Sequence, residues 1–370
     1  MRRCRWMFLL ALLSGLAVAE IQPESMGVST LADPKPTWLM VHDGLGPAYI
    51  FDSASGAMQG LLSLSKFTPA IEMNASMAEA YAAESYYSRG VRGERTDVLT
   101  IYDLSTLSPV AEVPIPHKIA ALEFPQYIEL MDDQRYVGVF NITPATSVSI
   151  VDVKERKFVQ EISTPGCALI MATAGRGFLQ ICGDGSLQLV RLGADGTESD
   201  RIRSKKFFSV EEDPVFDKPI ATGDGWLLTS YQGQVFEVSV ADNQINITEP
   251  WAMLTDADDG AGWRPGGGQF IAYHAGQDLL FVLMNPGGEF AHDTAGTEVW
   301  VFNRQVQKRV AQLPLEHSGT NLSVSQDDKP LLTVTGEDGQ LHVFDVATLS
   351  LVRTIAEVGV APGLLQNFYQ

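Results

Sequence analysis

One pattern of apolar and polar positions recurs seven times along the chain. Each copy has an alternating apolar strand that ends at a polar residue, then a short turn and a second strand, as in LTIYDLSTLSPVAEV. The copies begin at Ala48, Leu99, Val148, Leu187, Gly233, Val299 and Leu341. Alternation with a period of two residues is typical of β-strands that bury one face, so we expect an all-β protein.

The spacing of the copies predicts a ring of sheets. Seven copies in 370 residues correspond to a period of about 50 residues, which is typical of propeller blades. Further strands are expected at Tyr136–Ile142, Gly177–Ile181, Trp226–Tyr231, Leu279–Met284 and Leu331–Thr335. We therefore predict a seven-bladed β-propeller over residues 20–370, in which each blade is a four-stranded antiparallel sheet. An N-terminal strand near Trp38–Val41 is expected to complete the last blade, because an open ring would expose strand edges.

Two segments depart from this regularity. Ile71–Ala83 fits either a short helix or a strand. The longest gap between copies, from Glu237 to Asn303, contains WAMLTDADDGAGWRPGGG, which is rich in turn residues. We interpret this stretch as a loop inserted on one face of the ring, where binding residues concentrate.

A polar residue ends the strand in each copy. These residues are Asp52, Asp103, Asp152, Arg191, Glu237, Asn303 and Asp345. An Asp at this place can accept hydrogen bonds from the amides of the following turn. We therefore expect these residues to stabilise the turns, and we assign none of them a catalytic role.

The first residues, MRRCRWMFLLALLSGLAVAE, have the features of an export signal. Basic residues precede an apolar run that is too short to span a bilayer, and small residues follow it. We predict a signal peptide at residues 1–19, cleaved after Ala19, and a protein located in a bacterial periplasm. Arg2 and Arg3 leave a twin-arginine signal as the alternative, although the residues beside them match that motif poorly.

Charge and cysteines add to this picture. The chain has 26 basic and 45 acidic residues, a net charge of −19. Such a charge repels nucleic acids and anionic membranes, so we expect neither as a partner. Cys167 and Cys182 flank two predicted strands joined by a turn. In an oxidising compartment this arrangement predicts a disulfide, with two buried free thiols as the alternative.

A search for catalytic motifs finds no self-sufficient set. The six histidines show no metal-ligand spacing, and neither HExxH nor GxSxG occurs. Asp256, Asp258, Asp259 and Gly260 are similar to a calcium loop, but the glycine comes one place early and the last ligand position lacks Glu. We predict no catalytic residue and no metal site, and expect a propeller of this kind to bind something.

Three segments resemble one known family. They are SRGVRGERTDVLTIYDLSTL from Ser88, GWRPGGGQFIAYHA from Gly262, and NLSVSQDDKPLLTVTGEDGQLHVFDVATL from Asn321. All three are similar to segments of the heavy chain of quinoprotein amine dehydrogenases, which include methylamine dehydrogenase and aromatic amine dehydrogenase. The resemblance covers roughly Tyr86 to the C-terminus, and the Cys167 and Cys182 pair falls where that family has its disulfide.

The resemblance implies that this chain is one subunit of a larger enzyme. The family's heavy chain is a propeller in a periplasmic H2L2 enzyme, and the small, disulfide-rich light chain carries tryptophan tryptophylquinone. That quinone oxidises a primary amine to an aldehyde and ammonia, and electrons then pass to a blue copper protein such as amicyanin or azurin. By this resemblance the present chain binds no cofactor itself and contributes a platform for the light chain and a wall of the substrate channel.

Candidate contact residues follow from the same comparison. The family places an aromatic channel-lining side chain in its first-blade loop, where this sequence offers only His42 and Leu45. Arg92 and Arg95 belong either to a light-chain contact or, with Arg89 and Asp97, to an ion network between blades. Trp263 and Arg264 either anchor the long insertion or meet a partner as a pair.

The residues themselves are also compatible with two other classes of function. The first is a stand-alone periplasmic propeller that binds a protein or a small ligand. The second is a propeller hydrolase with a metal in the central channel, which would require Glu, Asn and Asp to face inward from several blades.

Overall fold

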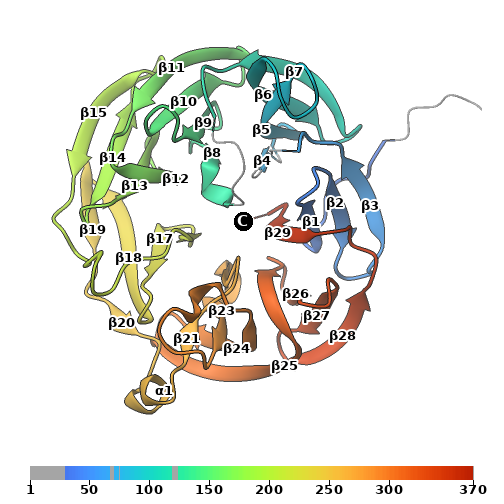
Figure 1. Cartoon of the computed structure of the whole chain (residues 1–370), viewed down its shortest axis with the longest axis vertical. Helices are drawn as coiled ribbons and strands as arrows, with labels where there is room; N and C mark the ends of the chain where they lie inside the picture. The colour runs from blue at the N-terminus through green and yellow to red at the C-terminus, as the bar shows by residue number, and fades with distance from the viewer. Residues whose placement is uncertain (1–29, 67–70, 75, 119–123, 370) are drawn as a thin grey trace, which may run out of the picture.

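The computed structural model describes residues 30–66, 71–74, 76–118 and 124–369. The predicted signal peptide and its cleavage site lie outside these residues. The described chain forms a ring of antiparallel sheets around a central axis, as Figure 1 shows, so the all-β propeller prediction is confirmed. Among the described residues, no helix has the length and apolar character needed to cross a membrane.

Strands are numbered along the chain, and three sheets come from its first half except for one strand, β29. From the axis outward, the first sheet contains β29 (Pro362–Asn367), β1 (Trp38–Asp43), β2 (Ala48–Asp52) and β3 (Met58–Leu62). The second contains β4 (Ile71–Asn74), β5 (Glu79–Tyr87), β6 (Arg95–Asp103) and β7 (Ser108–Pro114). The third contains β8 (Ile128–Leu130), β9 (Tyr136–Asn141), β10 (Ser147–Asp152) and β11 (Lys157–Ser163).

The other sheets follow in chain order. The fourth contains β12 (Cys167–Thr173), β13 (Gly177–Cys182), β14 (Leu187–Leu192) and β15 (Glu198–Arg203). The fifth contains β16 (Ile220–Ala221), β17 (Trp226–Thr229), β18 (Gln234–Ala241) and β19 (Gln244–Ile247), and β20 (Trp251–Ala252) also pairs with β18. The sixth contains β21 (Arg264–Pro265), β22 (Ile271–His274), β23 (Leu279–Asn285), β24 (Gly296–Asn303), β25 (Lys308–Val324), β26 (Leu331–Gly336), β27 (Leu341–Asp345) and β28 (Ser350–Ile355).

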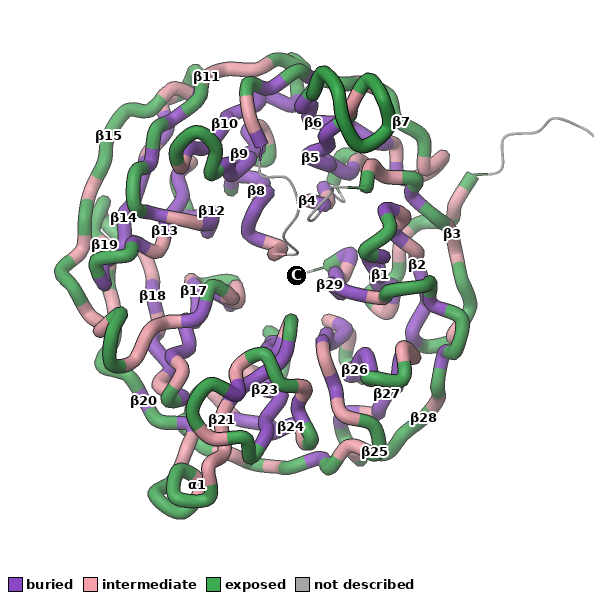
Figure 2. Tube along the Cα trace, in the orientation of Figure 1, coloured by how far each residue is buried: buried purple, intermediate pink, exposed green. Residues whose placement is uncertain are grey.

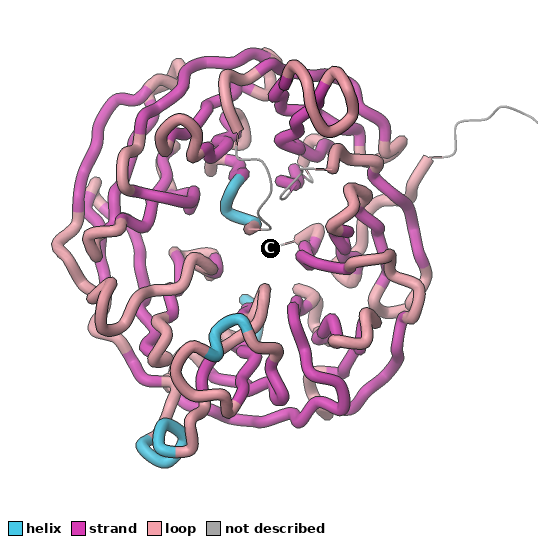
Figure 3. Tube along the Cα trace, viewed as in Figure 1, coloured by secondary structure: helices cyan, strands magenta, loops and turns pink. Residues whose placement is uncertain are grey.

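Helical structure is sparse in the described chain (Figure 3). It comprises α1 (Asp256–Gly260) and the 3-10 turns η1 (Pro125–Tyr127), η2 (Ala275–Gln277) and η3 (Ala291–Asp293). The segment that fitted either a helix or a strand contains β4 and the start of β5, so the strand interpretation holds for its described residues.

The prediction of seven blades, each a separate four-stranded sheet, is wrong. The described strands join into five separate blades of four or five strands and one continuous sheet of eight. The cause is β25, a strand of 17 residues. Its first part pairs with β24 and its second part with β26, so the copies that begin at Val299 and Leu341 share one strand and one sheet.

The ring closes in a different way from the prediction. The N-terminal strand β1 does not complete the last repeat; the C-terminal strand β29 instead joins the first sheet as its innermost strand. The register places Leu39 opposite Asn367 and Val41 opposite Leu365. Pairing of the two chain ends covers the inner edge of β1 and closes the ring.

The core lies between neighbouring sheets, and Figure 2 shows buried middle strands with exposed outer strands and loops. Leu99 of β6, Val137 of β9 and Val151 of β10 are fully buried in one cluster that joins two sheets. Burial of such a side chain contributes roughly 1.5–3 kcal/mol. Each sheet is therefore stabilised by the sheets on either side of it.

The interpretation of the strand-ending Asp residues is confirmed. Asp103 accepts hydrogen bonds from the backbone N–H groups of Ser105 and Thr106, at 2.7 and 2.9 Å. Asp345 accepts one from the N–H of Thr348 at 2.8 Å. Each carboxylate satisfies amides that the turn leaves unpaired.

Candidate partner-binding face and central channel

One face of the ring gathers equivalent connections from all the sheets. Within each sheet, successive strands outward from the axis run in opposite directions. The connection between the second and third strands therefore lies on the same face of the ring as the segment that leads into the innermost strand. Backbone hydrogen bonds join the two kinds of segment, from Gly44 N–H to Ala361 O at 3.0 Å and from Gly183 N–H to Gly166 O at 2.9 Å. We call this the hairpin face; it is formed by the connections β1–β2, β5–β6, β9–β10, β13–β14, β17–β18, β23–β24 and β26–β27.

The hairpin face carries unusually exposed apolar side chains. Phe290 is 80%, Val360 79% and Val91 65% exposed, and these are the three highest values for large apolar side chains in the described part of the chain. Leu45, at 56%, lies beside Val360 across the ring closure, where Gly44 and Ala361 are hydrogen-bonded. Exposed apolar groups gathered on one face are typical of a surface that binds another protein.

Phe290 has a further peculiarity. Its backbone φ is 69°, which is the left-handed region that bulky residues rarely adopt. An exposed aromatic side chain held in that conformation gains nothing from packing within this chain. The β23–β24 connection thus presents Phe290 to the surroundings of the protein.

His42 and Leu45 lie close in sequence but differ in environment. His42 is buried in β1, and its Nε2 is 2.6 Å from Oε1 of Gln366 in β29. Burial lowers the pKa of His42 to about 4, although the hydrogen bond to Gln366 acts in the opposite direction. His42 is therefore neutral at pH 7 and supports the ring closure, while Leu45 stands on the surface.

Arg92 and Arg95 also separate. Arg95 pairs with Asp97, 2.8 Å between Nε and Oδ1, and donates to the backbone oxygen of Lys118. Asp97 in turn accepts from the hydroxyl of Ser85 and the N–H of Lys118. Arg95 thus takes part in a network between strands β5 and β6 and the segment after β7, while Arg92 is exposed in the β5–β6 connection.

Trp263 and Arg264 anchor the long insertion. The Trp263 ring packs against Trp300, with 5.1 Å between ring centroids. Arg264 pairs with Asp259 of α1 at 2.7 Å and donates to the backbone oxygen of Trp263. Both residues lie beside the start of the β23–β24 connection, since Gly288 N–H bonds to Gly262 O.

The sequence similar to a calcium loop is the short helix α1. Thr255 is its N-cap, and Asp258 completes a capping box by accepting from the hydroxyl and the N–H of Thr255 at 2.7 and 3.0 Å. Arg309 pairs with the same carboxylate at 3.2 Å. These contacts explain the acidic residues through helix capping and ion pairing.

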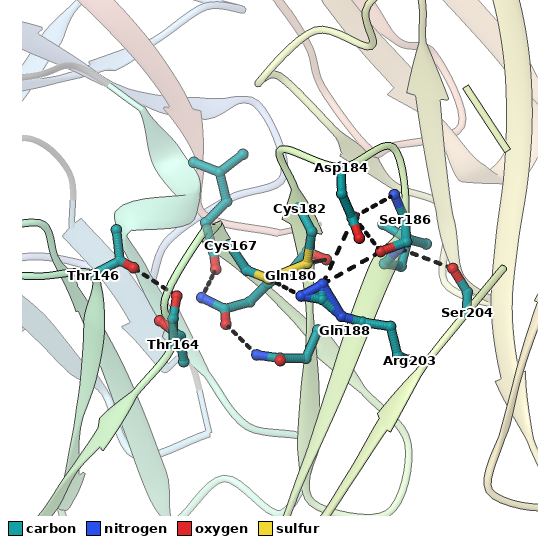
Figure 4. The surroundings of a disulfide bond; sticks show 12 residues. Thr146, Thr164, Cys167, Gln180, Cys182, Asp184, Ser186, Gln188, Arg203 and Ser204 are labelled. Carbon is teal, nitrogen blue, oxygen red and sulfur yellow. Dashed lines mark hydrogen bonds and ion pairs between the residues drawn. A yellow bond between two sulfur atoms is a disulfide. The ribbon is translucent and has the colours of Figure 1, made fainter. Parts of the chain in front are cut away.

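The predicted disulfide is confirmed. Cys167 of β12 and Cys182 of β13 are directly opposed in register and covalently bonded. Figure 4 shows Arg203 beside the bond, where its Nη2 lies 3.3 Å from Cys167 Sγ. The bond lies next to the β13–β14 connection and so stiffens one sector of the hairpin face.

The central channel contains two carboxylates that the sequence analysis did not single out. Glu72 of β4 and Glu129 of β8 line the same cavity of about 260 Å³, together with residues of four other innermost strands (β16, β22, β25 and β29). Enclosure by the protein raises the pKa of Glu72 to about 8. The pKa of Glu129 is raised well above its ordinary value, first by burial and then by the charge of Glu72.

These carboxylates left a weak signal in the sequence. Each interrupts an apolar strand, Ile71-Glu72-Met73 and Ile128-Glu129-Leu130, but such short strands show no clear periodicity. Gln269, Gln366 and Asn367 also line the channel. Within the described residues, however, the one group of three or more metal-capable His, Cys, Asp and Glu side chains lies elsewhere.

Comparison with known proteins assigns the chain to a family. The family model described as "Methylamine dehydrogenase heavy chain (MADH)" matches residues 26–368. The chain belongs to the methylamine dehydrogenase heavy chain family. The resemblance inferred from the sequence segments is thereby confirmed, and the match extends it to nearly the whole chain.

Individual relatives agree with this membership. A methylamine dehydrogenase heavy chain from Methylophilus methylotrophus is 26% identical, over 96% of this chain and 92% of the relative. One from Methylobacillus flagellatus is 30% identical, over 75% of this chain and 70% of the relative. This member of the heavy chain family therefore aligns with its relatives along most of their length.

Solved structures support the fold alone. The dihydro-heme d1 dehydrogenase NirN matches with a TM-score of 0.59 and 15% identity, over 91% of this chain and 76% of that one. The β-propeller domain of Cps50 (Swd1) from Myceliophteria thermophila matches with a TM-score of 0.61 and 14% identity, over 87% of this chain and 98% of that one.

Proposed function

We propose that this chain is the large subunit of a periplasmic amine dehydrogenase that oxidises primary amines to aldehyde and ammonia. Membership of the methylamine dehydrogenase heavy chain family over residues 26–368 is the observation that carries the proposal. Its partner is a small, disulfide-rich light chain in an H2L2 heterotetramer. When present on that light chain, tryptophan tryptophylquinone supplies the oxidation, and an amicyanin- or azurin-like blue copper protein accepts the electrons.

Two tryptophans of the described chain lie side by side. The rings of Trp263 and Trp300 pack against each other, with 5.1 Å between their centroids. Trp300 is fully buried, and its Nε1 donates to Glu298 at 2.6 Å. This geometry is that of core packing, which supports the proposal that the quinone belongs to the light chain.

The hairpin face fits the docking of the light chain. Phe290, Val360, Val91 and Leu45 offer exposed apolar area, and Arg92 adds a charged contact at its rim. Burial of a Phe or Val side chain contributes roughly 1.5–3 kcal/mol, and aromatic and Arg side chains are enriched at interfaces. Neutral, buried His42 and the network around Arg95 hold the adjoining loops.

Purification from the native periplasm tests the proposal. We expect a small, cysteine-rich subunit to co-purify with this chain and to show visible quinone absorbance. A variant with Phe290→Asp and Val360→Asp should lose that subunit, while Val306→Asp, in the connection between β24 and β25 on the opposite face, should retain it. A colourless monomer from wild-type cells would contradict the proposal and would favour a stand-alone binding protein.

A further inference from the structure

Two histidines and one aspartate meet at the β26–β27 connection, far from the central channel residues. His317 lies in β25, Asp338 in the turn between β26 and β27, and His342 in β27. One ligand atom from each side chain lies within 4.8 Å of the other two. The ring planes of His317 and His342 are nearly parallel, at 12°, with centroids 5.2 Å apart.

Both histidines direct the same nitrogen at the carboxylate. The Nε2 atom of His342 is 3.2 Å from each oxygen of Asp338, and the Nε2 atom of His317 is 3.8 Å from Oδ2. Two ligand atoms each about 2.1 Å from a tetrahedral zinc ion lie roughly 3.4 Å apart. The three atoms therefore stand close to the separations that a metal ion needs, and His317, whose side chain is 46% exposed, can move to complete them.

The surroundings hold the ligands in place. The hydroxyl of Thr354 lies 3.4 Å from Nδ1 of His342, so the second ring nitrogen is oriented and Nε2 faces Asp338. The backbone N–H of Gln340 donates to Asp338 at 3.1 Å.

Gly336 makes this approach possible. A Cβ atom at that position would lie 2.9 Å from Nε2 of His342 and would also clash with Oδ1 of Asp338. Any other residue would therefore push the two ligands apart. A cavity beside the cluster, lined also by Glu316 and Gln340, leaves room for a further ligand such as water.

We propose that His317, Asp338 and His342 form a site for a divalent transition-metal ion of the zinc and copper class. Two imidazoles and one carboxylate are the ligand set that such ions accept, whereas magnesium and calcium favour oxygen ligands alone. The three protein ligands leave at least one coordination position open. Bound metal would join the middle of β25, between its two paired parts, to the β26–β27 turn, which lies on the hairpin face.

Zinc titration of the purified chain, with any affinity tag removed and metal stripped by a chelator, tests this site. We expect one equivalent of Zn²⁺ to bind, and Co²⁺ in its place to give visible absorption bands. His317→Ala should weaken binding by about tenfold or more, since even loss of a partner outside the ligand shell costs that much. His317 is half-exposed, so this variant should fold.

His117→Ala is the matched control. His117 also sits beside a carboxylate, 3.1 Å from Glu161, but has no second histidine next to it, so its loss should leave zinc binding unchanged. Asp338→Asn, checked for native circular dichroism, should weaken binding as His317→Ala does. Wild-type protein that binds no Zn²⁺, or equal binding by wild type and His317→Ala, would overturn the proposal. Neither result bears on the dehydrogenase assignment.

Discussion

The carboxylate of Asp43 accepts a 2.6 Å hydrogen bond from the backbone N–H of Val360, although 317 positions separate the two residues in the chain. The same carboxylate accepts from the N–H of Leu45 at 2.8 Å. Asp43 itself is only 6% exposed. One buried carboxylate therefore positions two of the exposed apolar residues of the hairpin face, one near each end of the chain.

Replacement of Asp43 with Ala should destabilise the protein. The variant removes the acceptor for the amides of Leu45 and Val360, and a hydrogen bond to a charged group contributes about 1.5–3 kcal/mol. Urea unfolding of wild type and variant measures this loss. Asp43→Asn keeps one acceptor oxygen and should lose less. Equal stability of Asp43→Ala and wild type would show that the contact does not support the loops.

Loss of the disulfide should also lower the free energy of unfolding. A closed loop of 15 residues stabilises by about 3 kcal/mol, chiefly through the unfolded chain. The double variant Cys167→Ser and Cys182→Ser should therefore unfold at a lower denaturant concentration. Reducing agent should destabilise wild type but not the double variant. Two free thiols in unfolded, unreduced protein that lacks residues 1–19 would refute the bond.

His42 should make stability depend on pH. Its folded pKa of about 4 lies below the ordinary 6.5, so the unfolded chain binds more protons in this window. Stability is then full above pH 6.5 and falls as the pH drops towards 4, by on the order of 3 kcal/mol. Denaturant midpoints measured across this range should fall less steeply for His42→Gln. Parallel curves for the two proteins would contradict the buried, neutral histidine.

Glu72 should act with the opposite sign. Its folded pKa is raised to about 8, so the folded protein binds more protons than the unfolded chain between pH 4.5 and 8. The stability that protonation provides is full below pH 4.5 and is lost as the pH rises through that window. Glu72→Gln, which is neutral at every pH, should gain stability relative to wild type towards pH 8.

The control for that comparison is Glu249→Gln, at an exposed carboxylate outside the channel. Unfolding midpoints at pH 5 and pH 8 are the measurement. The control should have the wild-type midpoint at both pH values. If Glu72→Gln did so too, ionisation of Glu72 would not destabilise the folded protein.

Local pattern predicted the strands but not how they join. Alternation located strands such as the predicted Leu331–Thr335, which corresponds to β26, although nearly every residue of β26 is buried. The continuity of β25 was hidden because Pro314 lies within it, and proline usually ends or avoids a strand. The pairing of β1 with β29 depends on a contact between chain ends, which no local periodicity encodes.

The candidate site was predictable only where the residues carried a family motif or a covalent constraint. The bond between Cys167 and Cys182 followed from strand pairing and compartment. Phe290 and Val360 lie in connections without periodicity, so their exposure arises only from the tertiary structure. Glu72 and Glu129 share a channel because the ring brings two innermost strands together.

Amine-dependent dye reduction by the complex purified from its native periplasm is the decisive measurement for the amine dehydrogenase proposal. We expect at least one primary amine to drive dye reduction by wild type and by Val306→Asp. The double variant Phe290→Asp with Val360→Asp should show no such activity in the purified fraction. A wild-type preparation that reduces no dye with any primary amine would contradict the assignment of this chain as an amine dehydrogenase subunit.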